Sequence, residues 1–150
     1  MRVTPFRTTL PVSFALLAML AIVSPCLAGL KSAKVPFVKN EWADVAITQE
    51  GIHVLNYRIS LATNVSMNPL KVGAGPAMFF NVKNEGSAAT DFAIAVALFD
   101  KSGNLVGAAS GSHAGKLEAG ESKEIKVIFR DVNESVSDAT EVQVTVETRR

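Results

Sequence analysis

Strict alternation of apolar and polar residues near the C-terminus constrains the fold of this chain more than any other feature. In EVQVTVET, residues 141–148, Val142, Val144 and Val146 occupy every second position, and polar side chains fill the positions between them. Successive side chains of a β-strand point to opposite faces of its sheet, so these valines share one face. A helix would distribute them around its axis. The segment therefore predicts a strand with one buried and one solvated face.

The same period-two pattern predicts further strands at residues 43–48, 52–61, 77–83, 90–99 and 123–129. In residues 90–99, large apolar side chains share one face and alanines the other, which predicts a central strand whose alanine side is covered. Residues 52–61 have apolar side chains of both parities, and a bulge near Leu55 would reconcile them. The longest irregular connection follows this segment. Few apolar side chains occur in residues 131–140, where we expect one helical turn or a loop.

A hairpin is predicted where the apolar run of ALFDKSGNLVG, residues 97–107, is interrupted. Asp100 is placed to accept hydrogen bonds from the backbone N–H groups that follow it, and Gly103 is able to take a positive φ. The returning strand then weakens, because residues 105–115 are mostly small and polar. We expect this segment to be an edge strand or a crossing between two sheets.

Residues 1–28 have the order of a secretory signal peptide, in which two arginines precede an apolar block at residues 10–23 and small residues end at Ala28. About 20 apolar residues are needed to span a bilayer, and no segment of this chain has them, so no transmembrane span is expected. We predict cleavage after Ala28 and an extracytoplasmic location, periplasmic or secreted. The alternative is a lipid anchor on Cys26, although Pro25 fits a lipoprotein signal poorly.

Residues 29–41 show no sustained period and contain Pro36, and we expect a flexible N-terminal arm there. Residues 42–150 then form one domain. No cysteine remains after cleavage, so its stability has to come from a hydrophobic core rather than from disulfides. Short strands at regular spacing with turns between them predict an all-β fold, an immunoglobulin-like antiparallel β-sandwich of about seven strands.

Turn and strand motifs between residues 80 and 129 match a known pattern. They are a V-x-N-x-G turn (Val82, Asn84, Gly86), a strand that ends in ALFD, and an L-x-x-G-E-S turn (Leu117, Gly120, Glu121, Ser122). The segment resembles the bacterial FxLyD and CARDB-type immunoglobulin-like modules, although Ala97 stands where the FxLyD pattern has its first Phe. The resemblance implies a fold, and it implies an adhesion, envelope or accessory role outside the cytoplasm without catalytic residues.

The charge of the chain disfavours nucleic acid as a partner. The whole chain has 15 Lys and Arg against 14 Asp and Glu, and loss of the two arginines in the signal peptide leaves 13 basic residues against 14 acidic ones. A nearly neutral domain lacks the positive field that attracts nucleic acid or acidic membranes.

No motif predicts an enzyme, a cofactor or a metal site. His53 and His113 have no partners at zinc-ligand spacing, and GSHAGK, residues 111–116, departs from a phosphate loop in both its spacing and its last residue. Ser112 lacks the G-x-S-x-G elbow of a nucleophile, and GAGP, residues 73–76, lacks the dinucleotide-binding pattern. Four carboxylates that lack calcium-loop spacing are expected to form a solvated rim: Glu118, Glu121, Asp131 and Glu134.

Two pairs of aromatic residues are candidates for a contact surface, and the second pair, Phe79 and Phe80, offers the best single hint. Trp42 and Tyr57 are candidates for a sugar-stacking platform, but the parity of Tyr57 favours packing in the core. Phe79 and Phe80 are adjacent in a predicted strand and point to opposite faces, so one of them is a candidate for an exposed contact.

Two hypotheses follow for the function. In the first, the protein is a non-catalytic binding or accessory module of the cell envelope whose partner is another envelope or secreted protein, with the edge strand in residues 105–115 as a docking edge. In the second, it is a structural subunit of a surface assembly, in which residues 29–40 pair with a neighbouring molecule. An enzymatic function is the third and least favoured hypothesis, because no catalytic motif is present.

Overall fold

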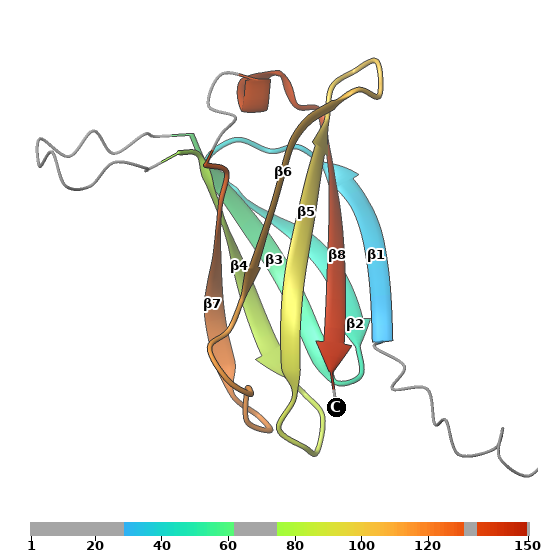
Figure 1. Cartoon of the computed structure of the whole chain (residues 1–150), viewed down its shortest axis with the longest axis vertical. Coiled ribbons are helices and arrows are strands. Elements are labelled where there is room, and N and C mark those ends of the chain that lie inside the picture. Colours follow the sequence, from blue (N-terminus) through green and yellow to red (C-terminus); the bar gives the residue numbers. More distant parts are fainter. Residues whose placement is uncertain (1–28, 62–74, 131–134, 150) are drawn as a thin grey trace, which may run out of the picture.

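Two antiparallel sheets of four strands each face one another across a shared core (Figure 1). The computed structural model describes residues 29–61, 75–130 and 135–149. Its elements are β1 (Gly29–Pro36), β2 (Trp42–Gln49), β3 (Ile52–Ser60), β4 (Ala77–Asn84), β5 (Asp91–Phe99), β6 (Leu105–Ser112), β7 (Ser122–Ile128), a 3-10 turn η2 (Ser135–Asp138) and β8 (Glu141–Arg149). The strand orders are β1-β8-β5-β6 and β2-β3-β4-β7. The predicted all-β sandwich is confirmed, and η2 is the expected single helical turn.

The strand β1 lies in residues 29–41, where we expected a flexible arm. β1 pairs with β8 along its whole length. Its half-buried Ala33 and Val35 pack against the core, whereas Leu30 is 66% exposed. A strand at the edge of a sheet with few buried positions has a weak period-two pattern, which is why the sequence did not predict it. The sandwich therefore begins at Gly29 and has eight strands rather than about seven.

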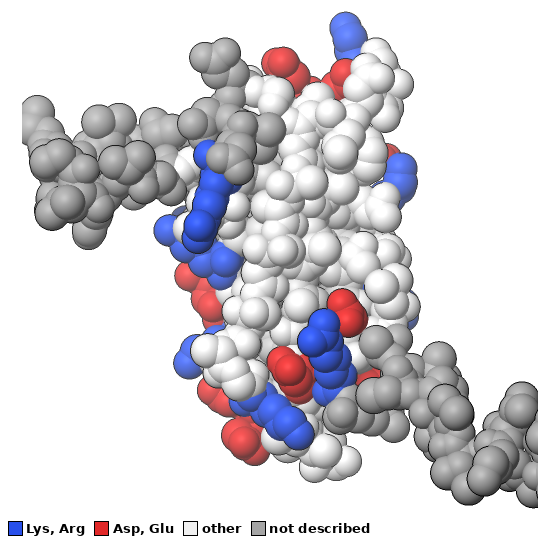
Figure 2. Space-filling view, viewed as in Figure 1, with Lys and Arg blue, Asp and Glu red and all other residues white. Residues whose placement is uncertain are grey.

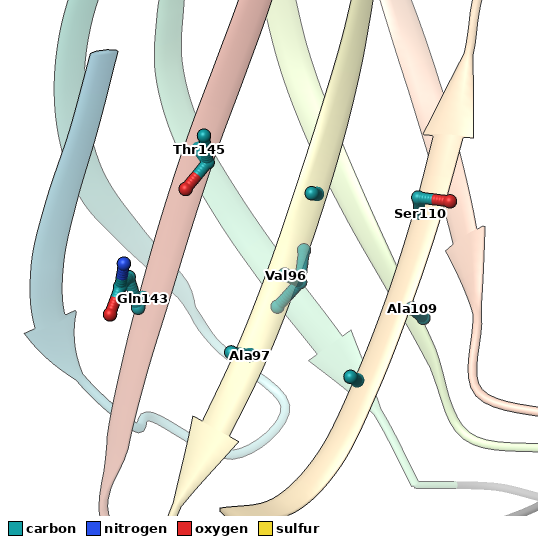
Figure 3. A pocket seen from close by; sticks show the side chains of 8 residues that line it. Val96, Ala97, Ala109, Ser110, Gln143 and Thr145 are labelled. Carbon is teal, nitrogen blue, oxygen red and sulfur yellow. The ribbon is translucent and has the colours of Figure 1, made fainter. Parts of the chain in front are cut away.

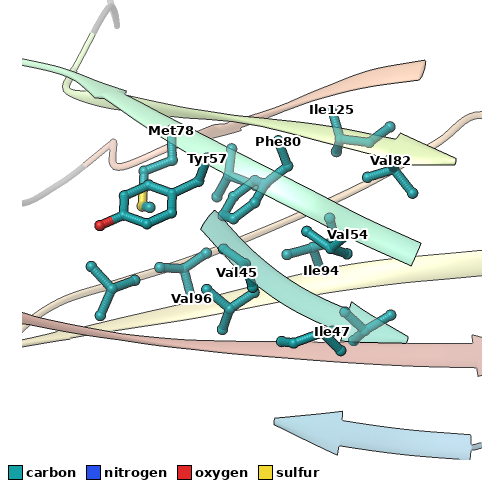
Figure 4. Packing of buried hydrophobic residues seen from close by; sticks show 14 of the residues in the cluster. Val45, Ile47, Val54, Tyr57, Met78, Phe80, Val82, Ile94, Val96 and Ile125 are labelled. Carbon is teal, nitrogen blue, oxygen red and sulfur yellow. The ribbon is translucent and has the colours of Figure 1, made fainter. Parts of the chain in front are cut away.

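The core fills the space between the two sheets. Val142, Val144 and Val146 of β8 have no exposed surface, as the alternation of that segment predicts. Figure 4 shows residues of the opposite sheet, such as Phe80, pointing toward Ile94 of β5. Full burial of one such side chain stabilises a fold by about 1.5–3 kcal/mol, so these residues supply the main favourable term. The largest aromatic side chains with almost no exposed surface are Tyr57, Phe80, Phe92 and Phe129.

The hairpin between β5 and β6 closes as predicted. The carboxylate of Asp100 accepts hydrogen bonds from the backbone N–H groups of Ser102 (2.8 Å) and Asn104 (2.9 Å). Gly103 has a φ of 82°. The side-chain amide of Asn104, followed by the backbone N–H groups of the turn, holds the pKa of Asp100 below its ordinary value. The ionised form of Asp100 is therefore the form that stabilises this turn.

A bulge at Leu55 decides which residues of β3 face the core. Pairing with β4 includes Val54 and then Asn56, and it leaves Leu55 out of register, in agreement with the predicted bulge. The extra residue changes the parity of the strand, so Val54 and Tyr57 are both buried. Arg58 consequently faces outward from the sandwich.

The alanine side of β5 differs from the prediction. β5 is central, with β8 and β6 as neighbours, which confirms its expected place. However, its alanine side is not covered: Ala95 is exposed and Ala93 and Ala97 are half-buried. The large side chains of β5 face the opposite sheet and fill the core between the two sheets. In the described part of the chain, no third layer covers the alanines on the other side.

The edge strand β6 contacts η2 near its start and approaches β7 of the other sheet near its end. The hydroxyl of Ser135 in η2 donates a hydrogen bond to the carbonyl oxygen of Val106 at 2.7 Å. Near the other end, a Cβ added to Gly111 would lie 3.0 Å from the carbonyl oxygen of Lys126 in β7. The predicted edge position is confirmed for β6, and the carbonyl oxygen of Val106 is already occupied by Ser135.

Candidate functional site

His53 and Ser112, whose sequence context disfavours a metal or nucleophile site, lie in different sheets. His53 lies in β3 with its Nδ1 3.3 Å from Oε2 of Glu85, and the amine of Lys83 followed by this imidazole lowers the pKa of Glu85. Ser112 is the last residue of β6, and His113 follows it. No three His, Cys, Asp or Glu side chains among the described residues are close enough to hold a metal ion. The structure therefore does not bring these residues together as metal ligands.

The GSHAGK segment continues β6 into an open turn and then leads to β7. Gly115 has a φ of 86°, and a Cβ added there would meet nothing within 4 Å. One of the four candidate carboxylates, that of Glu121, stabilises the next turn, because its Oε2 accepts a hydrogen bond at 3.1 Å from the backbone N–H of a second candidate, Glu118. The other two, Asp131 and Glu134, lie outside the described residues.

Several predictions concern segments that the structure does not describe. The signal peptide, Cys26 and the first two residues of GAGP fall in residues 1–28 and 62–74. Within the described residues, the structure contains no helix that is long and apolar enough to cross a bilayer.

The turn residue Asn84 has a structural role. Its buried side-chain amide donates hydrogen bonds to the carbonyl oxygens of Ala88 (2.9 Å) and Leu117 (2.8 Å), and its oxygen accepts one from the backbone N–H of Gly86 at 2.9 Å. A neighbouring backbone bond of 2.7 Å links Glu85 to the carbonyl oxygen of Gly51. The V-x-N-x-G and L-x-x-G-E-S turns therefore meet in space and hold one end of the sandwich together.

Of the two residues considered for a sugar platform, one is in the core and one is on the surface. Tyr57 is fully buried, and its hydroxyl donates a hydrogen bond to the carbonyl oxygen of Pro36 and accepts one from the N–H of Val38. Burial raises the pKa of this phenol. Trp42 is 43% exposed on the outer side of β2. The sequence-based preference for Tyr57 in the core is confirmed, so Tyr57 does not form a sugar-stacking platform with Trp42.

The outer side of the β1-β8-β5-β6 sheet carries an uncharged surface, which we call the small-residue face. It is built from side chains that lie opposite one another in the sheet register: Ala95, Ala97, Ala108, Ser110, Gln143 and Thr145. Figure 2 shows this side of the molecule free of charge at its centre. Figure 3 shows Gln143 and Thr145 of β8, Ala97 of β5 and Ser110 of β6 around a shallow hollow.

Charged pairs border the small-residue face. The amine of Lys34 in β1 lies 2.6 Å from Oε1 of Glu141 and 5.2 Å from the centre of the Phe99 ring. At the other end, Nε of Arg149 lies 3.3 Å from Oε1 of Glu147. A polar rim around an uncharged centre is the arrangement found at many protein interfaces.

The outer side of the β2-β3-β4-β7 sheet carries four residues directly opposite one another, which we call the aromatic–cation row. The register pairs Trp42 with Arg58, Arg58 with Phe79, and Phe79 with Lys126. The guanidinium carbon of Arg58 lies 5.2 Å from the centre of the Trp42 ring and 5.4 Å from that of Phe79. The amine of Lys126 lies 5.6 Å from the centre of the Phe79 ring. Aromatic and cationic side chains thus alternate across the sheet.

The contacts within the aromatic–cation row fall in the range of cation–π interactions, each worth about 0.5–1 kcal/mol at an exposed site. They leave the positive charges without carboxylate partners, since no ion pair joins Arg58 or Lys126 to another of the described residues. Nε of Arg58 is buried and has no hydrogen-bond partner. The row therefore presents two cations held by aromatic rings.

Sequence reasoning identified part of this row. The pattern predicts that either Phe79 or Phe80 is exposed, because the two face opposite sides of a strand, and in the structure Phe80 is buried while Phe79 lies on the outer side. Arg58 and Lys126 were missed. Their parity in the strands was the available signal, but only the pairing of strands places them in line with Phe79.

No protein-family model matches this chain, and no curated protein matches it.

Proposed function

We propose that this protein is an exported, non-catalytic immunoglobulin-like module of the cell envelope, and that its small-residue face docks onto another envelope or secreted protein. The signal-peptide pattern of residues 1–28 supports export. The resemblance of residues 80–129 to FxLyD and CARDB-type modules supports a binding or accessory role. The observation that carries the docking proposal is the uncharged, exposed centre of the face around Ala95.

The small-residue face suits a protein partner for two physical reasons. Alanine and serine side chains lose little conformational entropy when a partner covers them. No charge has to be stripped of water at the centre of the face, where an unpaired ion would oppose association strongly. The pairs Lys34–Glu141 and Glu147–Arg149 stay at the rim, where water still reaches them.

The test is to place a charge at the centre of this face. Ala95→Glu is expected to lower the amount of envelope protein crosslinked to the tagged chain at least about tenfold, because the carboxylate would be buried without a partner. The matched control is Ala119→Glu, which adds the same charge at an exposed turn position. Thermal unfolding should be unchanged in both variants. Equal crosslinking by Ala95→Glu and the wild type would contradict docking through this face.

A structural subunit of a surface assembly is the second candidate function. It is supported by the peripheral place of β1, a terminal edge strand without a fully buried side chain. Such a strand is able to pair with β8 of a neighbouring molecule in place of its own β8. A lipid anchor on Cys26 is the alternative to free release, and mass spectrometry of the N-terminus of the exported protein distinguishes these two.

A further inference from the structure

The aromatic–cation row lies on the sheet opposite to the small-residue face and forms a flat strip across four strands. Neighbouring strands lie about 4.8 Å apart, so the strip extends roughly 14 Å from Trp42 to Lys126. Its two cations, Arg58 and Lys126, are separated by Phe79 and therefore by about 10 Å along the strip. The surface thus offers two positive charges at a fixed spacing, with an aromatic ring beside each of them.

A comparison with Lys34 shows what is unusual about these cations. Lys34 also lies over an aromatic ring, that of Phe99, but its charge is balanced by Glu141 at 2.6 Å. Arg58 has two aromatic neighbours and no carboxylate among the described residues, and its Nε is buried without a hydrogen bond. Rings on both sides limit the rotation of the guanidinium, and a preorganised guanidinium loses less freedom when it forms paired bonds with an anion.

We propose that the aromatic–cation row is a binding site for an acidic glycan, a sugar polymer that carries carboxylates. In this complex the guanidinium of Arg58 binds a sugar carboxylate and Lys126 attracts a second one farther along the polymer. The exposed indole of Trp42 contacts the apolar face of a sugar ring, since an aromatic face offers a flat apolar surface to such a ring. This inference goes beyond the docking of a protein on the other sheet and does not depend on it.

The neighbouring row of the same sheet argues for a glycan rather than a densely charged polymer. Asp44 lies two residues from Trp42 in β2, and Glu124 lies two residues from Lys126 in β7, on the same outer face. These carboxylates repel polyphosphates and nucleic acids, which need an extended positive field. A glycan whose carboxylates are widely spaced is able to place them at Arg58 and Lys126 and to keep them away from Asp44 and Glu124.

The flatness of the strip argues against an extended peptide. Peptides that bind sheets or grooves obtain much of their affinity from main-chain hydrogen bonds at a strand edge or from pockets for side chains. The row lies on a sheet face, where the backbone groups already pair within the sheet. Ring stacking and charge are the interactions that this surface supplies.

Fluorescence of the full chain titrated with polygalacturonate tests the proposal. Trp42 is the single tryptophan of the chain, so its emission reports contact at the row directly. We expect a saturable change in emission that weakens as salt is added, because both cations are accessible to screening. Fully methyl-esterified polygalacturonate keeps the sugar rings but lacks the carboxylates, and it is expected to bind at least about tenfold more weakly.

Variants then separate binding from stability. Arg58→Gln is expected to weaken binding of polygalacturonate about tenfold, and Lys126→Gln, at an exposed position of the edge strand β7, about threefold. Lys34→Gln is the matched control, because it removes a cation–π contact on the other sheet and should leave binding unchanged. Lys126→Gln keeps the test valid if Arg58→Gln unfolds.

Three outcomes would overturn the proposal. The first is no binding of polygalacturonate, or equal binding of the acidic and esterified polymers. The second is tighter binding of poly-glutamate or of polyphosphate, which would assign the row to an acidic peptide or to a phosphate polymer. The third is a lower melting temperature in the Arg58 and Lys126 variants with unchanged affinity, which would make the row a purely structural feature. None of these outcomes bears on the small-residue face, whose test uses a different sheet and a different readout.

Discussion

Asn84 shows how much of this sandwich depends on a single polar side chain. It is fully buried, and its three side-chain hydrogen bonds to the described residues all go to backbone groups of two different turns. A buried polar group is tolerated only when its hydrogen bonds are made, and here its partners are backbone carbonyl and amide groups of the two turns, of which the carbonyl oxygens of Leu117 and Ala88 also accept a bond from Thr90. Asn84 therefore supplies hydrogen bonds to backbone groups at the point where the β4–β5 connection meets the turn around Leu117.

Replacement of Asn84 by alanine is expected to destabilise the fold by about 2 kcal/mol, because it leaves the carbonyl oxygen of Leu117 and the N–H of Gly86 without this partner. Urea unfolding followed by circular dichroism measures the change. Asn81→Ala is the control, since Asn81 donates to Asn56 at 2.8 Å on the outer side of the sheet and should cost less than about 1 kcal/mol. Equal losses in the two variants would contradict this role of Asn84.

At the level of elements, Tyr57 joins the connection between β1 and β2 to the central strand β3. Its ring is in the core, and its hydroxyl reaches Pro36 and Val38 in the crossing segment. The chain has to pass from one sheet to the other at this point, and no strand pairing holds the segment between Pro36 and Trp42 apart from a bridge at Lys39. The phenol therefore fixes the position at which β2 begins.

Tyr57 makes the stability of the sandwich sensitive to alkaline pH. Burial raises the pKa of the folded-state phenol above the ordinary value of about 10, which applies to the unfolded chain. The contribution of the protonated phenol to the free energy of unfolding is fully present below pH 10. It is lost as pH rises from there through the folded-state pKa, because the unfolded chain releases the phenol proton more easily than the folded one. Tyr57→Phe should remove this alkaline loss and cost about 1 kcal/mol at neutral pH.

The measurement is urea unfolding of both proteins between neutral pH and pH 11. Lysines titrate over the same range in wild type and variant, so the difference between the two curves isolates the phenol. Tyr57 is the single tyrosine of the chain, and tyrosinate absorbance of the native protein gives its pKa independently. Parallel stability curves would show that the phenol is as easily ionised in the fold as in water.

The elements that the sequence predicted are those whose burial alternates strongly. β8 and β5 place large side chains on one face only, and the hairpin at Asp100 depends on neighbours within five residues. β1 was not predicted, because its pairing with β8 is stabilised mainly by backbone bonds, which leave no pattern in side-chain type. The alanine side of β5 was misread for a related reason: small residues occur on covered and on open faces alike.

The whole molecule has two outer faces of different character, and neither was visible in the composition. The net charge, +1 for the chain and near −1 for residues 29–150, averages over a small-residue face without charge at its centre (Figure 2) and a row with two cations that pair with no carboxylate of the described residues. The aromatic–cation row joins residues from four strands that are far apart in sequence. Its line depends on the register of three strand pairs and on the bulge at Leu55, which sets the side to which Arg58 points. Sequence reasoning is able to assign parity, but register is decided by packing over the whole domain.

The oligomeric state distinguishes the two functions at this largest scale. If β1 belongs to its own domain, as in this structure, the protein is a monomer, and deletion of residues 29–36 exposes the edge of β8 along its whole length. An open edge of that length pairs readily with other chains, so the deletion is expected to form dimers or larger species in light scattering. A synthetic peptide of residues 29–40 should restore the monomer by occupying that edge. In a surface assembly built by exchange of β1, the intact chain is itself oligomeric, so light scattering of the intact chain separates the two functions.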